Sequence, residues 1–120
     1  MTTVLMVDDN PADIDDMNKI LTKAGFFTLT QPDGIHILDF LRENSADLIM
    51  LDLVMPKING IEVLREIKVE FPDIPVIMCS AAGLEQVVAL ALRVGAAGYV
   101  VKPYHEQELL DSIRKVTGKK

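Results

Sequence analysis

The sequence predicts an α/β fold, a doubly wound (βα)5 three-layer sandwich in which a five-stranded parallel sheet lies between two layers of helices. Short apolar runs alternate five times with longer segments whose apolar residues recur at helical spacing. These runs show no regular polar alternation, as is typical of strands covered on both faces. The 120 residues, 49% hydrophobic and 25% charged, have the size and composition of one globular domain, which we expect to span residues 1–120.

The expected strands are the apolar runs 4–7, 26–29, 48–51, 76–79 and 99–101. The fourth run contains the single cysteine, Cys79, so an intramolecular disulfide is impossible and a buried structural thiol is expected. Because consecutive parallel strands are joined by right-handed crossovers, each connection between these runs should carry a helix on one face of the sheet.

Five helices are expected between and after these strands. The first begins near Asn10-Pro11 and ends before Gly25, and the second begins at Asp33 as its N-cap. The third follows residues 59–60 and stops before Pro72, because proline cannot continue a helix. The fourth covers about residues 84–94, and the fifth covers the apolar positions 109–116 before a helix-ending glycine.

Charge and hydropathy exclude several classes of function. The 12 Lys and Arg residues against 18 Asp and Glu give a formal net charge of -6, which argues against direct binding of nucleic acid or of an anionic membrane surface. No apolar run approaches the roughly 18 residues that span a bilayer. The N-terminus lacks the basic flank of a signal peptide, so a cytoplasmic location is expected.

Polar side chains follow four of the expected strands at their carboxyl ends. Asp8 and Asp9 follow the first strand, Asp52 the third, Ser80 the fourth and Lys102 the fifth. Ligands of open parallel sheets bind outside these ends, where the strand order reverses. In the order 2-1-3-4-5, which we take from known doubly wound sheets, the first and third strands are neighbours, and the three carboxylates would converge.

Converging carboxylates need something that relieves their repulsion. Two unit charges about 4 Å apart at an effective dielectric near 20 repel by roughly 4 kcal/mol, which corresponds to a pKa shift of about 3. Either one carboxylate holds a proton at neutral pH, or a divalent cation lies between them. All-oxygen ligands favour Mg²⁺ over zinc. With a lysine and a hydroxyl nearby, such a site suits phosphoryl transfer, in which the carboxylate attacks and an aspartyl phosphate forms.

Four motifs together resemble the receiver domain of two-component response regulators, over about residues 3–116. They are Asp8-Asp9, the segment from Asp52 through Met55-Pro56 to Asn59-Gly60, Ser80-Ala81, and Lys102-Pro103. Each motif alone is weak evidence, but their joint order and spacing are highly specific. The resemblance implies a flavodoxin-like, chemotaxis-regulator-like fold and a signalling domain that promotes only its own phosphorylation and dephosphorylation, not an enzyme that acts on an external metabolite.

The resemblance also implies a role for each matching residue. Asp52 would accept a phosphoryl group from a phosphohistidine on a sensor histidine kinase or a histidine phosphotransfer protein. Asp8 and Asp9 would hold Mg²⁺, with Mn²⁺ as a substitute, together with Asp52 and the backbone carbonyl of Val54. Lys102 would pair with the acceptor carboxylate and then with the phosphoryl group.

The family's switch falls on Ser80 and Tyr99. The Ser80 hydroxyl would move toward the phosphoryl oxygen, and Tyr99 would change between exposed and inward positions. Receivers usually have a cis peptide bond after the lysine, which here is Lys102-Pro103. These roles are implied by the resemblance alone.

The expected fourth helix is apolar almost all round, with Glu85, Gln86 and Arg93 as its strongly polar residues. A helix on an outer face should show a polar side, so the excess suggests a docking surface. Receivers commonly use the face made by the fourth helix, fifth strand and fifth helix to dimerise or to bind a downstream protein target. The alternative is a helix packed tightly by its neighbours.

Other interpretations stay open at this stage. Asp8 and Asp9 could cap the first helix, and the same sheet could belong to a flavodoxin-like FMN electron carrier or an aspartate-nucleophile phosphatase. The acidic loop after the first strand would repel the FMN phosphate, and the adjacent aspartates do not have the phosphatase spacing. The start at Met1 and the short tail favour a stand-alone regulator over a receiver cut from a longer chain.

Overall fold

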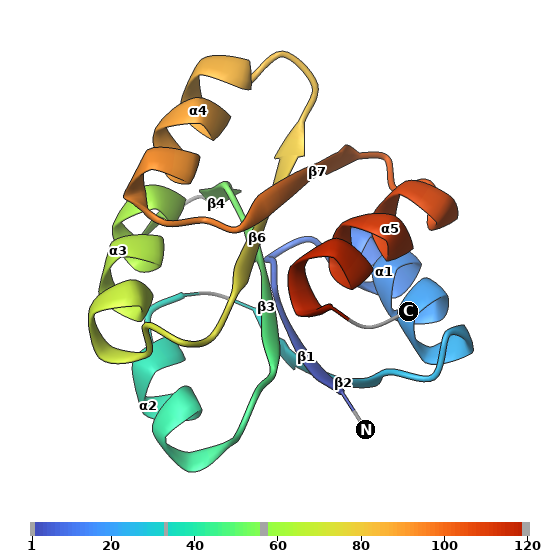
Figure 1. The fold of residues 1–120 in the computed structure, drawn as a ribbon, viewed down its shortest axis with the longest axis horizontal. Coiled ribbons are helices and arrows are strands. Elements are labelled where there is room, and N and C mark those ends of the chain that lie inside the picture. The colour runs from blue at the N-terminus through green and yellow to red at the C-terminus, as the bar shows by residue number, and fades with distance from the viewer. Residues whose placement is uncertain (1, 33, 56–57, 119–120) are drawn as a thin grey trace.

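The computed structural model describes residues 2–32, 34–55 and 58–118. Its main sheet has five parallel strands in the order β2-β1-β3-β6-β7 (Figure 1). This is the predicted order 2-1-3-4-5, because β4 and β5 form a separate small hairpin. The bounds are Thr3–Val7 for β1, Phe27–Gln31 for β2, Leu48–Asp52 for β3, Val76–Ala81 for β6 and Gly98–Lys102 for β7. The predicted fold class is therefore confirmed.

The hairpin of β4 and β5 is absent from the predicted elements. β4 (Val54–Met55) pairs in antiparallel register with β5 (Ile58–Asn59), so that Val54 lies opposite Asn59. It follows β3 almost directly and connects it to α3. The backbone just beyond Asp52 is thereby held in a defined position at the edge of the sheet.

Five helices cover the two faces of the sheet, as predicted. They are α1 (Pro11–Lys23), α2 (Ile37–Glu43), α3 (Gly60–Glu70), α4 (Glu85–Val94) and α5 (Glu106–Thr117). Figure 1 shows α1 and α5 on one face and α2, α3 and α4 on the other. The side chain of Asn10 accepts hydrogen bonds from the backbone N–H groups of Ala12 and Asp13 and so begins α1. Gly118, at φ 72°, ends α5.

The predicted start of the second helix is wrong. The helix begins at Ile37, later than the expected Asp33, and its N-cap residue His36 makes no side-chain capping hydrogen bond. Asp33 itself lies outside the described residues. Ile35, which a helix capped at Asp33 would include, lies in a turn before α2 with 59% of its surface exposed. Ile37 is buried instead, together with Leu41 one turn further along the helix.

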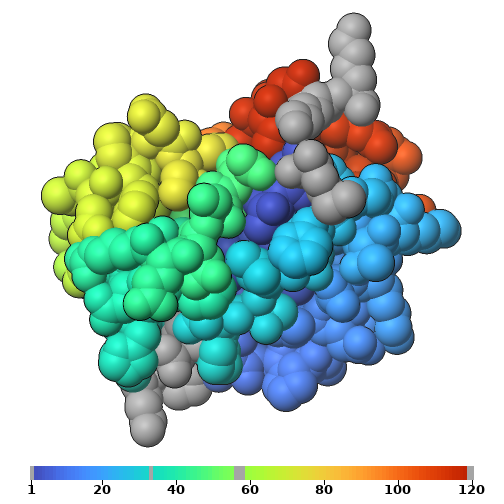
Figure 2. Space-filling view, turned by 90° about the horizontal axis from the view of Figure 1, so that it is seen from below, coloured from blue at the N-terminus to red at the C-terminus, as the bar shows by residue number. Residues whose placement is uncertain are grey.

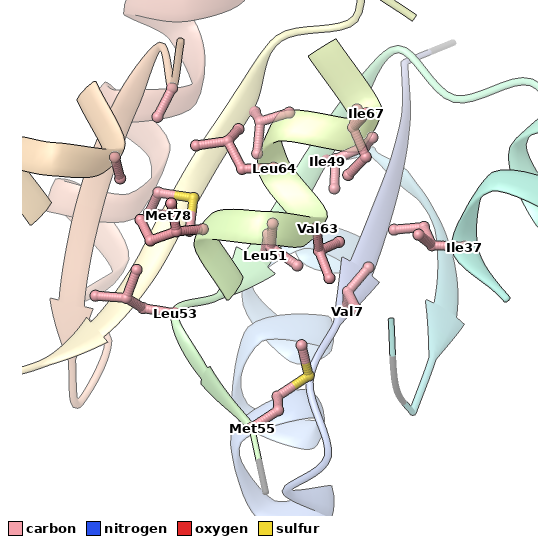
Figure 3. Close-up of a cluster of buried hydrophobic side chains, with 14 of the residues drawn as sticks. Val7, Ile37, Ile49, Leu51, Leu53, Met55, Val63, Leu64, Ile67 and Met78 are labelled. Atoms are coloured by element: carbon pink, nitrogen blue, oxygen red, sulfur yellow. The ribbon is translucent and has the colours of Figure 1, made fainter. Parts of the chain in front are cut away.

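The core forms two layers, one on each side of the sheet. One cluster joins the central strands to α2, α3 and α4, including Leu51, Leu64 and Met78 (Figure 3). The other joins them to α1 and α5 through residues such as Met17 and Leu109. α5 and the N-terminal strands, far apart in the sequence, therefore pack together, and the red and dark blue segments lie near each other in Figure 2.

Only the three central strands are fully covered on both faces of the sheet. The described residues of β1, β3 and β6 are almost all buried, whereas the edge strands β2 and β7 are only partly covered. Phe27 on β2 is 51% exposed and Tyr99 on β7 is 47% exposed. An edge strand lies at the side of the sheet, where the helix layers end, so the helices cover less of its surface. Among the described residues, no helix is long and apolar enough to span a membrane.

Candidate functional site

Three aspartates come together at the carboxyl edge of the sheet, as predicted. Asp8 follows β1 directly, Asp9 is the next residue, and Asp52 ends β3 beside it. Each offers a carboxylate oxygen, and these oxygens all lie within 4.8 Å of one another. Asp8 and Asp52 are buried, whereas Asp9 is exposed to solvent. The parallel pairing of β1 with β3 brings two chain segments more than 40 residues apart into one acidic cluster.

The pKa of the buried Asp52 carboxyl is raised by its surroundings in the cluster. Burial, and next the charge of Asp8, raise its pKa from 3.8 to about 6. The ammonium of Lys102 and the backbone N–H of Val54, which donates to Oδ1 of Asp52 at 3.4 Å, act in the opposite direction. This carboxyl therefore holds a proton more readily than an exposed aspartate.

The donor set of this cluster fits a hard divalent cation. Carboxylate oxygens are the ligands that Mg²⁺ prefers, and a cation among them would offset the repulsion that raises the pKa of Asp52. Cys79, the only cysteine, ends up buried behind the site on β6, where burial raises the pKa of its thiol to about 12. The cluster thus offers oxygen ligands without a thiolate.

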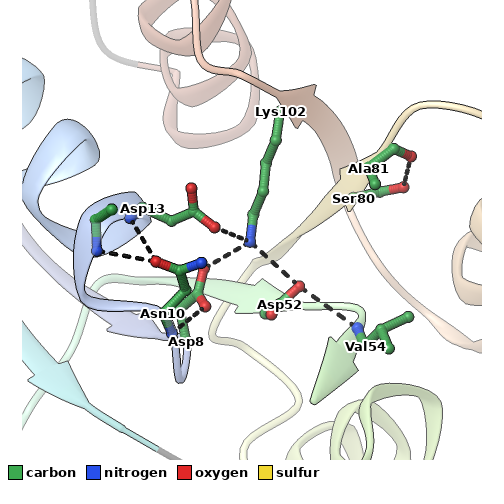
Figure 4. Close-up of polar contacts among 9 residues, drawn as sticks. Asp8, Asn10, Asp13, Asp52, Val54, Ser80, Ala81 and Lys102 are labelled. Atoms are coloured by element: carbon green, nitrogen blue, oxygen red, sulfur yellow. Dashed lines mark hydrogen bonds and ion pairs between the residues drawn. The ribbon is translucent and has the colours of Figure 1, made fainter. Parts of the chain in front are cut away.

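Lys102 crosses from the end of β7 to the acidic cluster (Figure 4). Its Nζ donates to Oδ2 of Asp8 and to Oδ2 of Asp13, both at 2.8 Å, and lies 3.5 Å from Oδ1 of Asp52. Burial lowers the pKa of Lys102, but the hydrogen bonds to Asp13 and Asp8 outweigh that effect and raise it above its ordinary value. The lysine is therefore a permanent positive charge.

Asp13 is the member of the site that sequence reasoning missed. It lies in the first turn of α1, three residues after the N-cap Asn10. An acidic side chain there is expected simply to favour the helix N-terminus, so its sequence position alone does not single it out. The signal that could have found it is geometric, because a helix that starts directly after β1 turns its first-turn side chains over the end of the sheet.

The loop between β1 and α1 shows that neither Asp8 nor Asp9 caps α1. Asn10, not either aspartate, is the N-cap residue. The backbone N–H of Asn10 donates to Oδ1 of Asp8 at 3.0 Å, which fixes the Asp8 carboxyl at the sheet edge. The capping function is therefore supplied by a separate residue, which leaves the second oxygen of Asp8 for Lys102.

Ser80 and the backbone of Val54 complete the pocket. A hollow of about 290 Å³ is lined by both of them together with Asp9, Asp52 and Lys102. The Ser80 side chain is buried, and its hydroxyl donates to the carbonyl of Ala81 at 2.7 Å, away from Asp52 (Figure 4). The peptide bond Lys102-Pro103 is cis, as the resemblance implied.

Tyr99 lies outside this pocket but next to it. It is on β7, three residues before Lys102, and its side chain is about half exposed. A second hollow, of about 220 Å³, is lined by residues that include Ser80, Leu84, Val88 and Tyr99. The expected switch residues Ser80 and Tyr99 therefore line one continuous recess between β6, α4 and β7.

Gly60 fixes the approach of α3 to the end of β3, the strand that carries Asp52. A Cβ at this position would clash with the carbonyl oxygen of Leu53 and would lie 2.9 Å from that of Asp52. The side chain of Asn59 caps α3 by accepting from the N–H of Ile61 at 2.8 Å. The Asn-Gly pair thus begins α3 tightly against the backbone that carries Asp52.

The outer face of α4 leaves apolar side chains in solvent. Val88 and Ala91 are the buried residues of this helix. The exposed apolar side chains of α4 and the neighbouring β7 are Val87, Leu90, Leu92, Tyr99 and Val101. The helix is therefore not packed on all sides by its neighbours within the described chain.

Known proteins share both this sequence pattern and this fold. A family model described as a response regulator receiver domain matches residues 4–114. The chain is 34% identical over 113 residues to the chemotaxis protein CheY of Bacillus subtilis, covering 93% of this chain and 94% of that protein. It is 37% identical to the transcriptional regulatory protein CpxR of Escherichia coli over 97% of this chain, and it spans about half of the CpxR length (49%).

Solved structures agree with the sequence comparisons. A response regulator receiver domain protein from Clostridium thermocellum superposes with a TM-score of 0.90 at 30% sequence identity, over 99% of this chain and 96% of that one. Nothing in these matches favours an FMN electron carrier or an aspartate-nucleophile phosphatase. The pattern of strand-end carboxylates, lysine and hydroxyl thus belongs to a signalling domain, and this chain is a member of the receiver domain family of two-component response regulators.

Proposed function

We propose that this chain is a phosphorylation-controlled switch in which Asp52 accepts a phosphoryl group from a histidine of a sensor kinase or of a histidine phosphotransfer protein. The observation that carries the proposal is the position of Asp52. Its carboxyl is buried at the sheet edge, lies within 4.8 Å of the Asp8 and Asp9 carboxylates, and lies 3.5 Å from the ammonium of Lys102. Such a carboxylate is suited to attack phosphorus where positive charge is concentrated.

Mg²⁺, or Mn²⁺ in its place, would be held by Asp8, Asp9, one oxygen of Asp52 and the backbone carbonyl of Val54, and it supplies positive charge to the phosphoryl oxygens. The ammonium of Lys102 neutralises the same oxygens from the side of β7. One carboxylate oxygen of Asp52 forms the new O–P bond, while the P–N bond to the donor histidine breaks and its electron pair returns to the imidazole. The chain promotes its own phosphorylation and dephosphorylation and does not hydrolyse external phosphate esters.

The change at Asp52 would be transmitted through Ser80. Its hydroxyl now donates to the Ala81 carbonyl, and a phosphoryl oxygen offers a charged and therefore stronger acceptor. Rotation of the hydroxyl toward it would alter the recess shared with Tyr99, whose ring can then move from its half-exposed position inward. The local charge would thus bias a two-state element on the β7 surface.

The docking face would be the surface of α4, β7 and α5. Exposed apolar side chains of α4 and β7 give it the chemistry of a protein interface, which either a second copy of the chain or a downstream protein could cover. The formal net charge of -6 supports a protein partner over nucleic acid.

The docking face can be tested with Leu90→Glu, because Leu90 is 46% exposed on α4. Val69→Glu is the matched control, since Val69 is also an exposed aliphatic residue but lies on α3. We expect Leu90→Glu alone to weaken phosphorylation-dependent self-association or target binding, while both variants are phosphorylated normally. Unchanged association of Leu90→Glu would contradict the docking face and leave the phosphoacceptor role intact.

The phosphoacceptor role can be distinguished from its rivals by turnover. We expect phosphate release from acetyl phosphate that requires Mg²⁺ and Asp52, because it passes through the modified aspartate. A generic phosphate ester, whose leaving group is poor, should not be turned over. Multiple turnovers of the ester would instead indicate a phosphatase, and a yellow purified protein would indicate bound flavin.

A further inference from the structure

Lys102 is shared among three carboxylates, and Asp52 is the most distant of them. The ammonium is 2.8 Å from oxygens of Asp8 and Asp13 and 3.5 Å from the nearest oxygen of Asp52. Figure 4 shows Nζ lying between Asp13 on one side and Asp52 on the other. The lysine side chain is 16% exposed, so water offers few alternative partners. In this state the lysine is therefore held mainly by groups other than Asp52.

Asp13 differs from the other two carboxylates in what it can bind. Asp8 and Asp52 belong, with Asp9, to the cluster of potential metal ligands among the described residues, and Asp13 does not. Its side chain is 26% exposed, and among the described residues its carboxylate is bonded to Lys102. A divalent cation in the acidic cluster would therefore engage Asp8 and Asp52 but leave the bond between Asp13 and Lys102 in place.

A phosphoryl group on Asp52 would change this balance. It brings several anionic oxygens close to Nζ, and charge-assisted bonds to them are stronger than the present 3.5 Å contact. An ammonium has three N–H donors, and two of them are bonded to Asp8 and Asp13, so a second bond to the phosphoryl oxygens must replace one of these two. Asp8 would be held by the metal ion, and Asp13 is the partner whose bond can be released into partial solvent contact.

Resting on the proposed function, we infer that Asp13 competes with the phosphoryl group for Lys102. It is a positioning residue that holds the ammonium back from Asp52 before phosphorylation and so lowers the affinity of the site for a phosphoryl group. Because coupling is reciprocal, phosphorylation must weaken the Asp13–Lys102 bond by the same factor. That bond links the first turn of α1 to the end of β7. Its release would therefore make α1 respond to phosphorylation together with the switch residues Ser80 and Tyr99.

The test uses the beryllium trifluoride anion, a stable mimic of the phosphoryl group, with Mg²⁺, and measures its dissociation constant by ¹⁹F NMR. We expect Asp13→Asn to bind the anion about threefold to tenfold more tightly than wild type, the range typical of coupled charged groups. The matched control is Asp16→Asn, which removes the same charge from an exposed position on α1. It should bind as wild type does.

A double-mutant cycle with Lys102→Met separates competition from simple charge removal. If Asp13 acts through the lysine, the effect of Asp13→Asn should shrink to less than about twofold when Lys102 is absent. An equal gain in both backgrounds, or no gain in either, would overturn the inference while the proposed phosphoacceptor role stands. Failure of wild-type protein to bind the anion with Mg²⁺ would overturn both.

A measurement on the unmutated chain keeps the inference testable if a variant does not fold. The ¹³C carboxyl resonance of Asp13 should move toward that of the exposed Asp16 when beryllium trifluoride binds, because its ion pair is released. A purely structural role for Asp13 would leave that resonance unchanged on binding. An unmoved Asp13 signal, with the anion bound, would contradict the competition.

Discussion

Replacing Asp52 by asparagine should stabilise the folded chain at neutral and alkaline pH in the absence of divalent cations. The pKa of Asp52 is raised from 3.8 to about 6, so its ionised form is less favourable in the folded chain than in the unfolded one. Two units of pKa correspond to about 3 kcal/mol. Asp52 lines a hollow at the edge of the sheet, and solvent screening there reduces this to about 1–2 kcal/mol. Asparagine keeps the shape and an oxygen acceptor but does not ionise.

The sign of the pH dependence follows from proton counting. Between pH 3.8 and about 6 the folded chain keeps the Asp52 proton that the unfolded chain has lost, so the free energy of unfolding falls as pH rises through this window. The wild type therefore carries the full cost above the folded pKa and little of it below 3.8. The gain from Asp52→Asn should be complete near about pH 8 and about half as large near about pH 5.

Urea unfolding followed by circular dichroism, with a chelator present, measures this gain. Asp16→Asn is the control, because it changes the net charge equally from an exposed position. Adding Mg²⁺ should stabilise the wild type more than Asp52→Asn, since the variant lacks one anionic ligand. A gain that is absent at about pH 8, or that grows as pH falls, would show that ionised Asp52 does not destabilise the folded chain.

Three further substitutions or treatments test other parts of the site. Gly60→Ala should lower the free energy of unfolding by about 1–3 kcal/mol and slow phosphorylation, because the new methyl group meets the carbonyls of Leu53 and Asp52. Urea unfolding measures the first effect, and a phosphorylation time course measures the second. Tyr104→Phe should leave stability unchanged or raise it by about 1 kcal/mol in the same unfolding assay, since its buried hydroxyl has no hydrogen-bond partner among the described residues. Cys79, buried and with its pKa raised to about 12, should react with a thiol reagent only after denaturant is added, which a colorimetric thiol assay records.

The sheet and its site were largely predictable because one rule places both. Apolar runs without polar alternation identify the strands, and the residue that ends each run must lie at the carboxyl edge. Asp8, Asp52 and Lys102 therefore converge whatever the exact helix boundaries are. Only the strand order had to be taken from known folds, because the neighbours of a parallel strand are not encoded in its own residues.

Features that depend on tertiary contact were not predictable in the same way. The start of the second helix failed because Ile35 and Ile37 are equally apolar, and only packing against the sheet decides that Ile37 is buried. The hairpin of β4 and β5 has two residues in each strand, too few to show a periodic pattern. Asp13 has the sequence context of an ordinary first-turn acid, and its bond to Lys102 spans 89 residues.

The intact mass of the chain after incubation with acetyl phosphate, quenched rapidly, shows whether Asp52 accepts a phosphoryl group. Wild type and Asp52→Asn are compared side by side, each with Mg²⁺ and with a chelator. We expect one added phosphoryl group on the wild type with Mg²⁺, and none on the variant or with chelator. An adduct that persists in Asp52→Asn, or no adduct on the wild type at any quench time, would contradict this expectation.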